Sequence, residues 1–156
     1  PSESDILDRI VVPGVLDQDL LARAEGVFAS RGDLPRARWM RLELDGYGAD
    51  TEAGDLETLL GGAAGEVVAD AILRCRVRHG RLAAGGAVRL WPHFFVESVT
   101  ELRALAHRVE GGGPEELVLD IGSAGRPALQ LGFERGIFAS VLQAVSIELG
   151  DALRRS

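Results

Sequence analysis

The chain has 156 residues, of which 46% are hydrophobic and 26% are charged. This is the length and composition of one folded domain, which excludes wholesale disorder. The net charge of −7 argues against broad binding to nucleic-acid phosphates, because such binding needs a concentrated positive surface. Every basic residue is an arginine, which excludes Schiff-base and phosphate-loop lysine chemistry.

Cysteine content and hydropathy indicate the cellular compartment in which we expect the protein. The single cysteine, Cys75, has no second thiol for an internal disulfide or a zinc pair. No apolar run reaches the roughly 18 uncharged residues of a membrane helix. Residues 1–10 lack the basic start and apolar core of a secretion signal. We therefore expect a cytoplasmic protein that does not enter the membrane.

The first half of the chain predicts helices. Residues 15–30 carry apolar side chains at helical spacing. In the turn that follows, we expect Gly32 to take a positive φ angle, Asp33 to cap the next helix and Pro35 to open it. The spacing predicts a helix over 36–44, with a strand as the alternative.

Glycines and aspartates bound the next elements. Residues 45–54 are acidic and contain glycine, which predicts an exposed loop. Residues 56–60 predict a short helix that ends at Gly61 and Gly62, since paired glycines take left-handed conformations readily. The run 66–82 starts with a helical pattern, but strict alternation over 74–79 favours a strand there.

The second half mixes both periodicities. Residues 87–91 predict a short strand broken by Pro92, and 96–109 predict a helix with a capping box formed by Ser98 and Glu101. Residues 133–153 predict a further helix-rich segment, although 145–149 could be a strand. We expect Trp39, Trp91, Phe94 and Phe95 to lie in the core.

The stretch 116–131, ELVLDIGSAGRPALQL, has two interpretations. An apolar strand followed by Asp120, Gly122 and Gly125 resembles the cofactor loop of S-adenosylmethionine-dependent methyltransferases or the phosphate loop of actin-like ATPases. Such a site needs further strands, and residues 126–156 are too few to supply them. The simpler interpretation, which we prefer, is a half-buried strand at 117–121 followed by a glycine turn.

Three short apolar-polar-apolar strands, at 88–90, 117–119 and 145–147, recur at the interval of a leucine-rich repeat. The predicted fold class is therefore α/β: a mainly helical part at 1–62, then leucine-rich-repeat-like strand–helix units at 63–156, in one domain spanning 1–156. If 36–44 is a strand, the alternative is an α+β fold with the order α-β-β-β-α-β-β-α.

A family resemblance points the same way. Between two predicted helices the chain carries Arg31, Gly32, Asp33, Pro35, Arg36 and the pair Arg41-Leu42. This segment resembles the bacterial repeat-companion domain, whose members often precede leucine-rich repeats, and 93–99 resembles the Gly-Phe-Val-Glu segment of that family. Leu34 is an insertion relative to the pattern. The resemblance covers about two-thirds of the chain and implies an architectural role without catalytic residues.

Candidate site residues are few. His79, His93 and His107 form no metal-binding pair in sequence, and Ser123 lies outside a nucleophile-elbow spacing. A run of arginines could bind a carboxylate-rich partner through bidentate pairs, with solvated side chains balanced by the chain's own acids as the simpler alternative. The candidate partner-binding residues are Arg74, Arg76, Arg78, Arg81 and Arg89.

These observations predict a non-catalytic protein-interaction or scaffolding module that binds an acidic protein and needs no cofactor or metal. They leave the oligomeric state open, a homodimer included. The first alternative is an acidic, dimeric adaptor similar to secretion chaperones. The second is an enzyme fragment that binds S-adenosylmethionine at 120–125.

Overall fold

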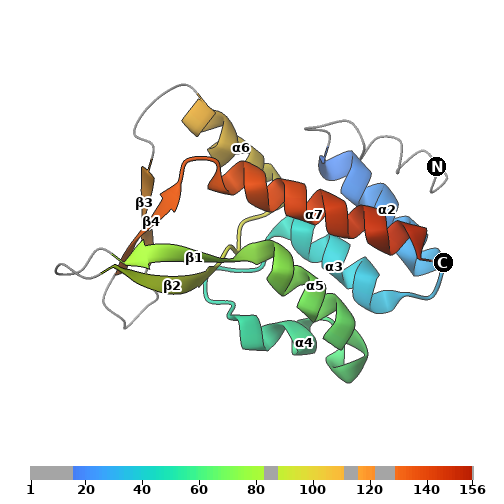
Figure 1. The fold of residues 1–156 in the computed structure, drawn as a ribbon. Coiled ribbons are helices and arrows are strands. Elements are labelled where there is room, and N and C mark those ends of the chain that lie inside the picture. Colours follow the sequence, from blue (N-terminus) through green and yellow to red (C-terminus); the bar gives the residue numbers. More distant parts are fainter. Residues whose placement is uncertain (1–15, 83–87, 111–115, 122–128, 156) are drawn as a thin grey trace.

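The structure is a computed structural model that describes residues 16–82, 88–110, 116–121 and 129–155. Helices gather at one end of this part of the chain and a four-stranded sheet lies at the other (Figure 1). The elements in order are α2 (Gln18–Ser30), α3 (Leu34–Asp45), η1 (Ala53–Asp55), α4 (Leu56–Leu59), η2 (Gly62–Gly65), α5 (Glu66–Arg76), β1 (Val77–Leu82), β2 (Arg89–Phe94), α6 (Val99–Glu110), β3 (Glu116–Ile121), β4 (Leu129–Glu134) and α7 (Ile137–Arg154).

The turn between α2 and α3 forms as predicted. Gly32 has a φ angle of 76°. Asp33 caps α3, its carboxylate accepting a hydrogen bond from the Arg36 backbone N–H at 3.3 Å. Residues 36–44 lie inside α3, so the helix prediction is confirmed and the alternative order is not observed. From α5 onward the order is α-β-β-α-β-β-α, one strand short of that alternative.

The strand predicted over 74–79 is half wrong. Arg74, Cys75 and Arg76 complete α5, and the strand starts at Val77. Helical spacing explains the difference, because the buried positions of α5 recur three and four apart: Val68, Ala69, Ile72, Cys75 and Arg76. The alternation of arginines with other residues over 74–79 therefore does not mark one strand. It arises because the last turn of α5 runs directly into the start of β1.

Two predictions at helix α6 and strand β2 had different outcomes. Ser98 Oγ accepts a hydrogen bond from the Glu101 N–H at 3.2 Å, which confirms the predicted helix start. Pro92 does not end its strand, because β2 continues to Phe94. An edge strand tolerates proline, since the missing N–H can lie on the unpaired side.

The sheet is antiparallel with the strand order β2-β1-β4-β3. The predicted strand at 117–121 lies in β3, whereas the strand β4 beside it was not predicted. Residues 145–147 lie within α7, so the third strand of the predicted repeat is wrong, and the leucine-rich-repeat-like arrangement is not confirmed. Gly122 and Gly125 lie outside the described residues.

Helices cover one face of the sheet. Leu131 and Phe133 of β4 are buried against α6 and the start of α7. The opposite face carries Leu90, Arg81, Gly132 and Val118 in one row across the four strands. Leu90 and Val118 are exposed, so this face is open to solvent, as is common for antiparallel sheets.

Helix α7 joins two hydrophobic clusters. Its first half contributes Ile137, Phe138 and Val141 to the cluster against the sheet. Its second half contributes Val145, Leu149, Ala152 and Leu153 to the cluster among α2, α3 and α5. A continuous helix of about 27 Å therefore ties both clusters together.

Gly80 is a site where a methyl group would be harmful. A Cβ at Gly80 would lie 2.7 Å from the Phe133 ring and 2.9 Å from Leu131 Cβ. We expect Gly80→Ala to lower the free energy of unfolding by about 1–3 kcal/mol, measured by urea denaturation. Gly26→Ala is the matched control, because Gly26 lies in α2 with open space around it and should gain about 0.5–1 kcal/mol. Equal effects of the two changes would contradict this packing.

Candidate functional site

Arg76 and Glu43 form a fully buried ion pair where α3, α5 and the end of β2 meet. Both side chains have 0% exposure. Arg76 Nη2 donates to Glu43 Oε1 at 2.6 Å, and Arg76 Nε donates to Glu43 Oε2 at 3.0 Å. The pairing is bidentate, which gives it both strength and a defined orientation.

Neighbouring groups complete the cluster. Trp39 Nε1 donates to Glu43 Oε2 at 3.2 Å, and the Tyr47 hydroxyl donates to the same oxygen. Arg76 Nη1 donates to the Phe95 carbonyl at 2.6 Å, and the Arg76 guanidinium lies 4.6 Å from the Tyr47 ring centre. Among the described residues, every buried side-chain nitrogen and oxygen has a hydrogen-bond partner. The polar groups of this cluster therefore satisfy one another's hydrogen bonds.

The electrostatics suit a structural role. Burial opposes the charged form of Arg76, but the adjacent Glu43 carboxylate outweighs it and raises the pKa of the guanidinium above its usual value. Burial, together with Glu43, raises the pKa of the Tyr47 hydroxyl well above its ordinary value. Tyr47 therefore stays neutral and keeps its proton for the hydrogen bond to Glu43 near neutral pH.

The predicted arginine stripe does not form. Arg76 is buried in the cluster, and Arg74 is bound to Glu148 at 3.0 Å. Arg78 donates to the Arg74 carbonyl at 3.0 Å, and Arg81 pairs with Glu116. Only Arg89 of the five is exposed without a hydrogen bond or ion pair to another described residue.

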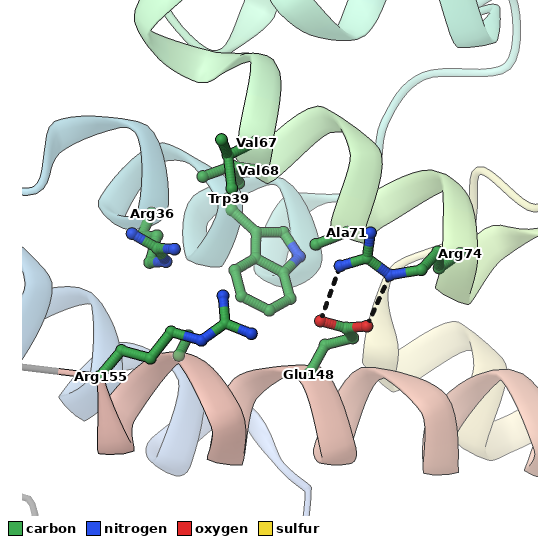
Figure 2. A pocket seen from close by; sticks show the side chains of 9 residues that line it. Arg36, Trp39, Val67, Val68, Ala71, Arg74, Glu148 and Arg155 are labelled. Carbon is green, nitrogen blue, oxygen red and sulfur yellow. Dashed lines mark hydrogen bonds and ion pairs between the residues drawn. The ribbon is translucent and has the colours of Figure 1, made fainter.

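A hollow beside Trp39 is too small for a ligand. Figure 2 shows Arg74 joined to Glu148 on one side of the indole and Arg155 on the other, with Arg36 nearby. Arg36 is itself paired with Asp33 at 2.7 Å. The space inside is about 10 Å³, close to the minimum for one water molecule. A small organic substrate does not fit there.

The described thiol and imidazole groups form no metal-binding cluster. Burial raises the pKa of the Cys75 thiol to about 12, which keeps it protonated and unreactive. No group of three His, Cys, Asp or Glu side chains within the described ranges could hold a metal ion. His93 packs between Phe95 and Phe133, with ring centres 4.6 and 6.1 Å away.

The most prominent surface feature is the free edge of β2. Within the described ranges this strand pairs with β1 alone and lies at the end of the sheet (Figure 1). Val88, Leu90 and Trp91 are 78%, 63% and 45% exposed. The expectation of a core position is borne out for Trp39 and Phe95 and is wrong for Trp91. Leu90 lies on the open face of the sheet and Trp91 on the other face, so exposed apolar groups flank this edge on both sides.

The sequence analysis predicted neither the buried Arg76–Glu43 cluster nor the exposed edge of β2, although the sequence contains a signal for the cluster. Trp39, Glu43 and Tyr47 recur four residues apart, the spacing of one helix face, and only Glu43 is charged. A carboxylate between two aromatic donors indicates a buried position that needs a cation. The β2 edge gave no such signal, because its exposure depends on which strands pair.

Comparisons with models of protein families, with curated proteins and with solved structures found no match. Among the described residues, none of the helices is both long enough and apolar enough to cross a membrane.

His93 should give the fold a pH dependence. Its burial lowers the pKa of the imidazole below the ordinary value of 6.5, so the unfolded chain binds the proton more readily. The His93 contribution is therefore fully present above about pH 6.5 and is lost as the pH falls toward the lower folded pKa. We expect urea denaturation to show a smaller loss of stability on acidification for His93→Gln than for the unchanged chain.

His107 is the matched control, since its side chain is 87% exposed. His107→Gln, a change of the same kind at this exposed position, should not reproduce the smaller loss of stability expected for His93→Gln. Parallel stability curves for all three proteins would contradict the assignment to His93.

Proposed function

We propose that this chain is a non-catalytic protein-interaction module that binds an extended protein segment along the free edge of β2. One observation carries the proposal: Val88, Leu90 and Trp91 are all exposed along a strand whose outer edge pairs with no other described strand, with Leu90 on the open face of the sheet and Trp91 on the other face. Such an edge offers backbone hydrogen-bond groups for a further strand and side chains that select it.

Charge and shape support the same surface. Arg89 lies between Val88 and Leu90, is exposed, and has no partner among the described side chains. Arg81 lies next to Leu90 across the β1–β2 ladder. Of the five arginines predicted to bind a partner, Arg89 lies on the edge strand, Arg81 lies one strand inward on β1 and is paired with Glu116, and Arg76 is buried. A segment that docks along β2 would meet Arg89 directly.

The resemblance to the repeat-companion domain also supports an architectural role. Gly32, Asp33 and Pro35, which carry part of that resemblance, serve the turn between α2 and α3. We propose that the chain belongs near that family and works in the cytoplasm, where a single buried thiol such as Cys75 is ordinary.

A photo-cross-linking amino acid at Leu90 tests the proposal in cells that produce the full chain. We expect discrete protein adducts from that position, because a bound segment would lie within reach of the probe. Val118 is the matched control, since it is 58% exposed and lies on β3 at the opposite edge. Equal or absent adducts from both positions would contradict a binding site at β2.

A further inference from the structure

The hydrogen-bond pattern shows which peptide groups of β2 face outward. Phe95 N donates to the Arg76 carbonyl at 2.9 Å, directly beyond the pair Val77 and Phe94. Bonded and non-bonded pairs alternate along an antiparallel ladder. Trp91 therefore bonds to β1, whereas the peptide groups of Leu90 and Pro92 point to the free edge.

Two copies of β2 can pair edge to edge, in antiparallel fashion, around a two-fold axis. The residue beside that axis then lies opposite its own copy, and Pro92, Arg89, Trp91 and Leu90 are the four candidates for this central position. Centring on Pro92 fails, because proline has no N–H to donate. Centring on Arg89 places like charges opposite each other, which is unfavourable. Centring on Trp91 brings Val88 of the second copy opposite Phe94, which packs against the helical core. Centring on Leu90 avoids the like charges and the contact with Phe94 and keeps proline out of the central pair, although each Val88 carbonyl then lies opposite Pro92 and receives no N–H.

The Leu90 register is self-complementary. Each Leu90 N–H donates to the Leu90 carbonyl of the other copy, and each Val88 N–H meets a Pro92 carbonyl. Arg89 of one copy then lies opposite Trp91 of the other, twice, on one face of the joined sheet. These are non-bonded pairs, in which side chains approach closely, and an arginine beside an indole forms a favourable cation–π contact.

We propose that two copies of this chain associate through antiparallel pairing of their β2 strands, centred on Leu90. The inference rests on the proposed function and names the bound segment as β2 of a second copy. An interface of one strand pair falls at the small end of protein interfaces, below about 1,200 Å². The dimer is therefore weak, with a Kd on the order of 10 μM or higher.

Sedimentation velocity of the full chain from about 5 to 500 μM tests the association. The mass should rise from 16.6 kDa toward twice that value. Arg89→Glu should raise the Kd about tenfold, because both cation–π contacts are lost. Arg103→Glu, an equal change of charge at an exposed position of α6, should leave the Kd unchanged. A constant mass of one chain, or equal effects of the two variants, would overturn the proposal.

Disulfide trapping tests the register. The Cα atoms of a bonded antiparallel pair lie about 5.5 Å apart, within the range of a disulfide. Leu90→Cys should therefore form a covalent dimer under mild oxidation much faster than Val118→Cys, while the native Cys75 stays buried. Equal rates would overturn the register. If photo-cross-linking at Leu90 yields only adducts with other proteins, the self-association fails while the proposed function stands.

Discussion

The buried pair of Arg76 and Glu43 is the constraint on which the rest of the fold depends. Arg76 ends α5 immediately before β1 and also binds the carbonyl of Phe95, just after β2. Glu43 anchors this guanidinium to α3, and Tyr47 encloses it. The Arg76 guanidinium thus links the end of α5, the segment after β2 and helix α3 at the point where the helices meet the sheet. A buried pair adds little net stability over apolar packing, but breaking it leaves an isolated charge.

Four other arginines hold the ends of helices through backbone carbonyls. Arg31, Arg38, Arg78 and Arg135 each donate to a backbone carbonyl near a helix end: Leu153, Leu60, Arg74 and Val109. A planar group with five donors reaches such carbonyls well and carries the positive charge that a helix C-terminus favours. These four arginines therefore serve the helical framework.

Local chemistry could be predicted from the sequence, and tertiary pairing could not. The turn at Gly32 and Asp33, the cap at Ser98 and the helix over 36–44 depend on neighbours a few residues away, and they form as expected. The alternation at 74–79 misled because a helix end and a strand start can share one polar pattern. Residues 145–147 satisfy a strand pattern locally, but they lie inside α7, where Val145 packs into the cluster among the helices and Ile147 is exposed. The exposure of Trp91 depends on sheet order, which no local pattern encodes.

The most direct test of the central role of Arg76 is a double-mutant cycle by urea denaturation, with Glu43→Gln, Arg76→Met and the two combined. If the pair organises the junction, each single change should lower the free energy of unfolding by about 3–5 kcal/mol, because it strands a buried charge. The double variant should then lose much less free energy of unfolding than the sum of the two single losses. Additivity within about 0.5 kcal/mol would show that the two residues act independently and would contradict this account.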